Sequence, residues 1–203
     1  MSKNPIIVFE GIEGSGKSFH INNVAKYLKR KRKKFIQIRE PGGSLNSEKI
    51  RKLILNNKSS FNKNTDLLLY LSARSENIEL IKKNLNKKII LIDRFVDSTL
   101  AYQHYGMGID LKLINTINKF LLKKIKVDFT FMNFVNNRNM NLRLSKRIKL
   151  NRYDKFKGSF YLKVQNGFNK ILKKNPKKYM KIDSNLDINL NKKLIISKIE
   201  KLI

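Results

Sequence analysis

The chain has 203 residues, of which 41% are hydrophobic, so it is long enough to bury one sizeable core. It contains no cysteine, which excludes disulfide bonds and thiolate metal sites. No apolar run approaches the roughly 18 residues needed to cross a bilayer, and no signal-peptide pattern precedes the first apolar segment. We therefore expect a single domain over residues 1–203 that is soluble and cytoplasmic.

The formal net charge is +30, from 45 Lys and Arg against 15 Asp and Glu. A field of this size attracts polyanions, so a nucleic-acid surface is one interpretation. The lysines, however, are spread over nearly every segment together with many Asn and Ile, and only residues 29–34 form a dense basic run. Because Lys, Asn and Ile have codons rich in A and T, a biased genome would give the same composition. We favour this explanation and predict no nucleic-acid partner.

The first predicted element is an apolar strand over residues 6–9, followed by the glycine-rich stretch GIEGSGKS and by apolar residues at helical spacing, Ile21, Val24, Ala25 and Leu28. This order and the spacing G-x-x-x-x-G-K-S are typical of a phosphate-binding loop. In such a loop Lys17 reaches the β- and γ-phosphates, and the Ser18 hydroxyl binds Mg²⁺. The alternative is a glycine turn between two core elements.

The rest of the chain alternates predicted strands and helices. Short apolar runs predict strands at residues 34–39, 89–92, 129–132 and 179–182. Helical spacing predicts helices at 45–55, 65–85, 110–122 and 159–172, a polar helix that contains Leu142 and Leu144, and a helix at the C-terminus. Five strands separated by helices indicate an α/β fold with a five-stranded parallel sheet flanked by helices.

Charged residues follow the predicted strands. Glu10 follows the first strand, Arg39 and Glu40 lie at the end of the second, and Asp93 and Arg94 follow the third. Ligands of open parallel sheets bind beyond the carboxyl ends of the strands. Acids at this edge can hold Mg²⁺ or its waters, and arginines can clamp a phosphate with two hydrogen bonds. Each residue taken singly could be a solvated turn residue, but their convergence on one edge favours a binding site.

Three stretches resemble the signature motifs of the thymidylate kinase family: VFEGIEGSGKS at residues 8–18, REPGGS at 39–44 and DRFVDSTLAYQ at 93–103. Their order and spacing match the family, and the similarity extends over essentially the whole chain. The resemblance implies a P-loop nucleoside monophosphate kinase fold and a homodimer. It also implies transfer of the γ-phosphoryl group of ATP to dTMP, with Mg²⁺ as cofactor, which gives dTDP for dTTP synthesis and DNA replication.

The same resemblance implies a set of site residues. ATP would be bound by Gly11, Ile12, Glu13, Gly14, Ser15, Gly16, Lys17 and Ser18. The acceptor dTMP would be bound by Glu10, Arg39, Pro41, Arg51, Tyr70, Arg74, Arg94, Ser98, Tyr102 and Gln103. Mg²⁺ would be bound by Ser18 and Asp93. The expected catalytic residues are Glu10, Lys17, Arg94, Arg147 and Arg152.

Arginines suit this reaction. The acceptor phosphate is already largely dianionic at neutral pH, so no strong general base is required. The site must instead align two phosphates that repel one another and neutralise charge in the transition state. Arg94 matches the family arginine between the acceptor and donor phosphates, and Arg39 and Arg51 match positions near the acceptor. In a chain this basic, each could also be an ordinary surface cation.

Base selection is expected from a predicted helix. Tyr70 and Arg74 stand four residues apart and so share one face of that helix. The resemblance implies that the Tyr70 ring stacks on thymine and that Arg74 donates to a thymine carbonyl. The alternative for Tyr70 is a place in the apolar stripe of the core. Tyr102 would obstruct a 2′-hydroxyl beside the deoxyribose, and Gln103 would bond the base edge.

We expect the charge that develops on the transferred phosphoryl group to be stabilised by arginines of a lid. Some family members carry an arginine in the phosphate loop, at the position of Gly14 here. In the other type, which this loop resembles, lid arginines take that role. We expect a mobile lid around residues 143–157, with Arg143, Arg147 and Arg152 as candidates and the last two preferred.

Two alternatives stay open. The first is another nucleoside monophosphate kinase, which faster turnover of AMP, GMP or UMP than of dTMP would favour. The second is a non-catalytic or nucleic-acid-binding protein that keeps the loop. The presence of all four candidate phosphate and Mg²⁺ residues argues against lost catalysis: Lys17, Ser18, Asp93 and Arg94.

Overall fold

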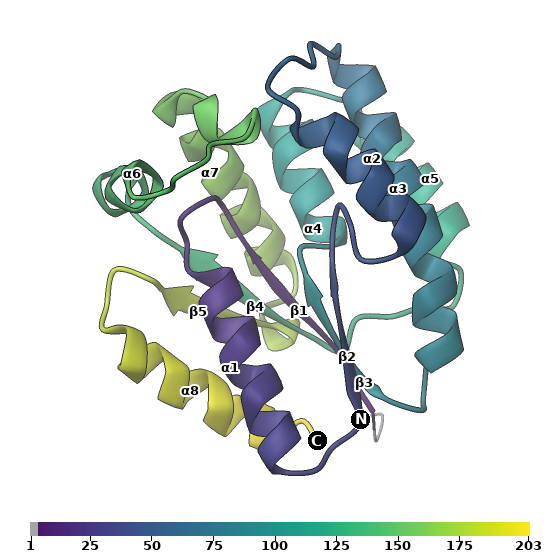
Figure 1. The fold of residues 1–203 in the computed structure, drawn as a ribbon, viewed down its shortest axis with the longest axis vertical. Helices are drawn as coiled ribbons and strands as arrows, with labels where there is room; N and C mark the ends of the chain where they lie inside the picture. Colours follow the sequence, from purple (N-terminus) through teal and green to yellow (C-terminus); the bar gives the residue numbers. More distant parts are fainter. Residues whose placement is uncertain (1–3) are drawn as a thin grey trace.

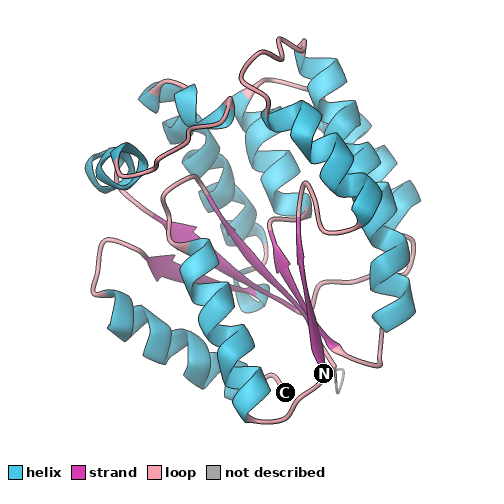
Figure 2. Ribbon diagram, in the orientation of Figure 1, coloured by secondary structure: helices cyan, strands magenta, loops and turns pink. Residues whose placement is uncertain are grey.

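The computed structural model describes residues 4–203, which form a five-stranded parallel sheet in the order β2-β3-β1-β4-β5. The strands are β1 (Ile6–Gly11), β2 (Phe35–Arg39), β3 (Ile89–Asp93), β4 (Phe129–Phe134) and β5 (Tyr179–Asp183). Helices lie on both sides of the sheet (Figure 1, Figure 2). The predicted α/β fold with a five-stranded parallel sheet is therefore confirmed.

The helices are α1 (Lys17–Arg30), α2 (Leu45–Leu55), α3 (Lys63–Asn84), α4 (Val96–Thr99), α5 (Leu111–Leu122), α6 (Asn137–Ser145), α7 (Gly158–Lys174) and α8 (Ile188–Glu200). A π-helix, η1 (Leu100–Gly106), continues α4, and short 3₁₀ turns lie at η2 (Tyr153–Lys155) and η3 (Pro176–Lys178). No helix within residues 4–203 is long and apolar enough to cross a membrane.

The central strand β1 is buried on both faces, which explains its continuous apolar run. Ile7 and Phe9 pack in a cluster with residues of α1 and α8, whereas Ile6 and Val8 pack in a cluster with residues of α3. Successive side chains of a strand point to opposite faces, so these two clusters cover the two sides of the sheet. The carboxyl end of β1 then leads directly into the glycine-rich loop and α1 (Figure 1).

One helical segment was not predicted from the sequence. Residues 96–106 form α4 and the π-helix η1, although the stretch VDSTLAYQHYG lacks a regular helical spacing of apolar residues. This segment packs closely on α7, where a Cβ on Gly167 would lie 2.6 Å from the Tyr105 ring. Packing therefore specifies this helix more than local pattern does. The segment carries Ser98, Tyr102 and Gln103.

Candidate active site

The phosphate loop depends on glycine at the end of β1. Gly11 has φ of +141°, and a Cβ there would lie 2.3 Å from the carbonyl oxygen of Asn133 in β4. Gly16 precedes α1 in a left-handed conformation, so the helix begins directly at Lys17. An anion in this loop would face the N–H groups of the first turn of α1. The alternative of an ordinary turn does not account for this geometry.

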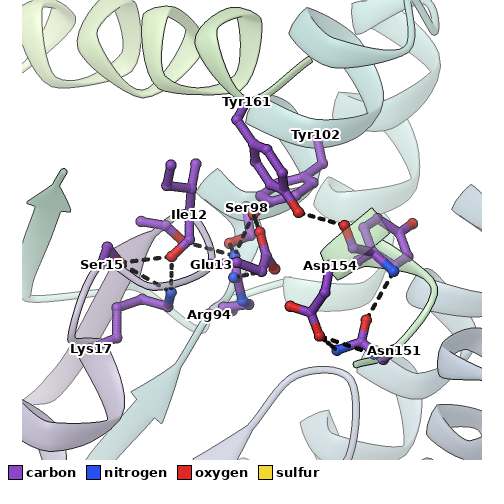
Figure 3. A network of polar contacts seen from close by, with 12 residues as sticks. Ile12, Glu13, Ser15, Lys17, Arg94, Ser98, Tyr102, Asn151, Asp154 and Tyr161 are labelled. Carbon is purple, nitrogen blue, oxygen red and sulfur yellow. Dashed lines mark hydrogen bonds and ion pairs between the residues drawn. The ribbon is translucent and has the colours of Figure 1, made fainter. Parts of the chain in front are cut away.

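Lys17 is buried and folded back on the loop. Its Nζ donates to the carbonyl oxygen of Ile12 at 2.7 Å and to Ser15 Oγ at 3.3 Å, as Figure 3 shows. Burial and the nearby charge of Arg94 lower the pKa of Lys17 to about 7. A phosphate in the loop would add its negative charge to that of Asp93, Glu13 and Glu10 and so favour the protonated ammonium group.

Ser18 and Asp93 fit a hard cation. Ser18 Oγ donates to Asp93 Oδ2 at 3.2 Å, and the buried Oδ1 of Asp93 has no partner among the described residues. Within residues 4–203 no group of three or more His, Cys, Asp or Glu side chains is placed to hold a metal. A hydroxyl and one carboxylate are the sparse oxygen set that holds Mg²⁺ when phosphates and waters complete its shell.

A cavity of about 200 Å³ lies beside this loop. Lys17, Ser18 and Asp93 line it from the phosphate side. Most of the residues expected to bind dTMP line it as well: Arg39, Pro41, Arg51, Tyr70, Arg74, Arg94, Ser98, Tyr102 and Gln103. The structure thus brings the predicted donor and acceptor residues together in one continuous site.

Arg94 lies in the cavity where the phosphate-loop residues meet the residues expected to bind dTMP. Its NH1 donates to the Gly11 carbonyl oxygen at 2.8 Å and to Tyr102 Oη at 3.2 Å, and its NH2 pairs with Glu13 at 2.7 Å (Figure 3). Burial by itself would lower the pKa of Arg94, but the charge of Glu13 raises it well above the usual value. Arg94 therefore stays charged where two phosphates would meet.

The Glu13 side chain faces the acceptor residues. It was predicted to bind ATP because it belongs to the loop, but its carboxylate lines the cavity, pairs with Arg94 and accepts a hydrogen bond from Tyr102. Although burial alone would raise the pKa of Glu13, the charges of Arg94 and Lys17 hold it below its ordinary value. Glu13 is thus an anion between the loop and η1.

Glu10 lies behind the cavity and does not line it. Its Oε1 accepts from the backbone N–H groups of Phe95 and Ser98, at 2.8 and 3.1 Å, and its Oε2 accepts from Ser98 Oγ at 2.5 Å. Burial raises the pKa of Glu10. In this arrangement Glu10 stabilises the N-terminus of α4 and orients Ser98.

The pair expected to recognise the base lies on α3. Tyr70 lines the cavity, with the ring of Tyr153 edge-on at 5.8 Å. Arg74 is 1% exposed, and its guanidinium donates to Glu40 at 2.9 Å, Thr99 at 2.9 Å and Asn118 at 2.7 Å. Arg74 is thus fixed in the cavity wall by three other segments of the chain.

The three arginines expected in a lid occupy different places. Arg147 lines the cavity and pairs with Asp154 at 2.5 Å. Arg152 does not line the cavity, because its guanidinium is bound to Asp66 of α3. Arg143, which was not preferred, donates to the Gly14 carbonyl oxygen at 2.8 Å and so contacts the phosphate loop.

Glu40 also lines the cavity, as its place among the charged residues at the strand ends predicted, although no ligand was expected for it. Five further lining residues were not predicted: Leu55, Phe95, Thr99, Asn151 and Tyr153. Phe95 and Thr99 lie inside the motif DRFVDSTLAYQ, which is the signal that could have identified them. The other three lie outside every motif. Their place in the site depends on how residues 150–153 pack against α2 and α3.

The chain is similar to known proteins over most of its length. A family model described as thymidylate kinase matches residues 9–195. The thymidylate kinase of Thermosipho africanus is 40% identical over 169 residues, which is 82% of this chain and 84% of that protein. The thymidylate kinase of Mycoplasma capricolum is 36% identical over 204 residues, covering 96% of each chain. The crystal structure of thymidylate kinase from Ehrlichia chaffeensis superposes with a TM-score of 0.78 at 33% identity, covering 97% of this chain and 98% of that one. This chain therefore belongs to the thymidylate kinase family.

Proposed function

We propose that this chain transfers the γ-phosphoryl group of ATP to dTMP, giving dTDP and ADP for dTTP synthesis and DNA replication. Members of this family are nucleoside monophosphate kinases, and the chain is an enzyme of that class. The observation that carries the proposal is the single cavity in which Lys17 and Ser18 of the phosphate loop meet the acceptor residues at Arg94. A non-catalytic protein that only keeps the phosphate loop would have no need of the acceptor residues beside it.

In the proposed reaction a phosphate oxygen of dTMP attacks the γ-phosphorus as the bond to the β-phosphate oxygen breaks. Lys17 and Arg94 neutralise the charge that spreads over the transferred group, and Arg147 adds a third cation from the lid. Ser18 and Asp93 would hold Mg²⁺. When bound, that ion would neutralise charge on the β- and γ-phosphates. The remaining work of the protein is alignment of two anions that repel one another.

We further propose that Tyr70 stacks on thymine and that Arg74 donates to a base carbonyl. A guanidinium group has five N–H donors. In Arg74, Nε and NH2 both contact Glu40, NH2 also donates to Thr99, and NH1 donates to Asn118. These four contacts leave one N–H donor, on NH1, for the base. Fixing the arginine in advance favours selectivity, because a wrong base would leave a buried donor unpaired.

The proposal includes the organisation of the protein. The chain is a single kinase domain, of which residues 4–203 are described, with a lid around residues 143–157, and two such chains form a homodimer. A cytoplasmic location fits the substrates ATP and dTMP. Nucleic acid is not among the proposed partners, because the lysines are spread over nearly every segment of the chain rather than gathered in blocks.

The test is a coupled assay of ADP release with ATP, Mg²⁺ and a panel of dTMP, AMP, GMP and UMP. We expect the highest kcat/KM with dTMP, and loss of turnover in Lys17→Ala. Folded wild-type protein that failed to turn over dTMP would refute the proposed activity. Arg74→Ala should reduce the preference for dTMP by about 10- to 100-fold, since it removes a charged donor. An unchanged preference would refute the base-recognition role alone.

A further inference from the structure

The lid is fastened to α3 at one carboxylate. The proposed lid around residues 143–157 begins in the last turn of α6, and we call the part between α6 and α7, residues 146–157, the lid segment. Asp66, in the first turn of α3, is 2% exposed, and its Oδ1 accepts from Arg152 NH2 while its Oδ2 accepts from Tyr153 Oη. Arg152 Nε also donates to the Ile54 carbonyl oxygen at 3.0 Å. Both oxygens of a buried acid on α3 are therefore used by the lid segment.

The residues held by Asp66 are connected to the cavity. Tyr153 lines the cavity, and its ring is edge-on to Tyr70 and to Tyr102 with centroids 5.8 and 6.0 Å apart. The next residue, Asp154, accepts from Arg147 at 2.5 Å and from Asn151 Nδ2 at 2.6 Å (Figure 3 shows the pair Asn151 and Asp154). A continuous set of contacts thus runs from α3 to the lid arginine that lines the cavity.

We propose that Asp66 is a positioning residue that holds the lid segment closed over the acceptor site, and that Arg152 serves this contact rather than the transferred phosphate. Asp66 itself does not line the cavity. Its effect on turnover is indirect: the closed lid keeps Tyr153 beside the acceptor and Arg147 in the cavity. The inference rests on the proposed function, because it concerns closure of that same site.

The hydrogen bonds accepted by Asp66 are strong enough to favour the closed lid segment and weak enough to let it open. A hydrogen bond to a charged group favours the bonded form only about 10- to 100-fold, because water replaces it when the partners separate. Two such bonds on one carboxylate bias the lid segment toward the closed form without locking it. Loss of the charge should therefore raise the open population about 10- to 100-fold.

The main test compares Asp66→Asn with the wild type. The substitution keeps the size of the side chain and removes its charge. We expect amide hydrogen exchange within residues 146–157 to accelerate about 10- to 100-fold, because exchange follows the open population. The kcat with dTMP should fall by a smaller factor, about two- to tenfold, because it follows the fraction of molecules that stay closed. The Kd of ATP, measured without dTMP, should change less than about twofold. Asp66→Glu, which restores the carboxylate, should recover at least part of both losses.

A second variant makes the test independent of folding defects. Tyr153→Phe removes one of the two donors and keeps the ring, so it should give a smaller loss of kcat and smaller exposure of the lid. Its effect should not add to that of Asp66→Asn, because both variants break the same bond. The matched control is Glu79→Gln on the same helix, whose ion pair with Lys82 is exposed and which should leave kcat and exchange unchanged.

The outcomes separate the hypotheses. If Asp66→Asn lowers only the melting temperature and keeps wild-type kcat and lid exchange, Asp66 is merely structural and the inference is wrong. Should Asp66→Asn fail to fold, unchanged kcat and exchange in Tyr153→Phe would have the same meaning. Wild-type protein without activity on dTMP would refute the proposed function instead, and the exchange data would still decide whether Asp66 holds the lid.

Discussion

At the scale of single residues, the phosphate-loop lysine is strongly affected by its surroundings. An ammonium group with an ordinary pKa of 10.5 is brought to about 7 by burial and by Arg94. Bound phosphates would reverse this shift, because they place negative charge against Nζ. Protonation of Lys17 and binding of ATP are therefore coupled.

The coupling predicts proton uptake. At pH 8 a group with a pKa near 7 is about nine-tenths neutral, so ATP binding that restores the charge of Lys17 should take up about 0.9 proton per site. Titration calorimetry in Tris and in HEPES should give heats that differ by the ionisation enthalpies of the buffers. Lys17→Arg, which is charged at every accessible pH, is the control and should show no uptake. Equal heats in the two buffers for the wild type would contradict the prediction.

Single-residue geometry also explains which site assignments could be made in advance. Lys17, Ser18 and Asp93 lie at motif positions whose backbone fixes where the side chain goes, and all three line the cavity. Glu10 and Glu13 are different. Their carboxylates are directed by contacts with α4, Arg94 and Tyr102, none of which is adjacent in sequence.

At the scale of elements, the contact between β1 and β4 controls the phosphate loop. The parallel pairing places Gly11 beside Asn133. This approach leaves no room for a side chain, and the φ of Gly11 lies in a region that disfavours any residue with a Cβ.

Gly11→Ala should therefore destabilise the protein by about 2–4 kcal/mol, which combines overpacking with backbone strain, and should also weaken ATP binding. Urea unfolding and ATP titration measure the two effects. The matched control is Gly108→Ala, with φ of +73° but no atom within 4 Å of an added Cβ. Gly108→Ala should lower the free energy of unfolding by only about 1–2 kcal/mol, from backbone strain alone. Equal losses in the two variants would show that the contact with β4 is unimportant.

The lid segment shows the limit of prediction for an element. The sequence indicates a polar, charged stretch around residues 143–157 but gives no partner for it. In the structure, Tyr153 of this stretch donates a hydrogen bond to Asp66 of α3, and the two residues are 87 positions apart in the chain. No local pattern encodes a bond of that separation.

At the scale of the whole molecule, apolar side chains remain exposed on α3 and α5. Leu68 is 56% exposed, and Leu113 and Phe120 are 46% and 71% exposed. Leu67 and Leu71 of α3 pack against Ile114 of α5, so the two helices are neighbours. Their outer surface is the candidate interface of the proposed homodimer.

Phe120→Glu should therefore convert the dimer to a monomer, because it places a charge in an apolar interface. Light scattering coupled to size exclusion should give the mass of two chains for the wild type and of one chain for the variant. Leu194→Glu on α8, 43% exposed, is the control and should leave the dimer intact. A monomeric wild type would refute the proposed assembly.

The net charge leads to a separate prediction for the molecule as a whole. Any binding to duplex DNA should be purely electrostatic and should weaken by about 10³-fold or more between 50 and 200 mM salt if several phosphates are contacted. Fluorescence anisotropy with two unrelated sequences measures this. Tight binding that survives 200 mM salt would indicate a selected nucleic-acid surface and overturn the compositional explanation.

The sequence by itself determined the order of the five strands and of the helices other than residues 96–106, the phosphate loop and the residues at the strand ends. These features are local, since apolar periodicity and glycine spacing act over a few residues. Only the tertiary structure decided that residues 96–106 form a helix, that Glu13 rather than Glu10 faces the acceptor cavity, and that Arg152 binds Asp66. Each of these depends on packing between segments distant in the chain, where burial and charge select one partner among many.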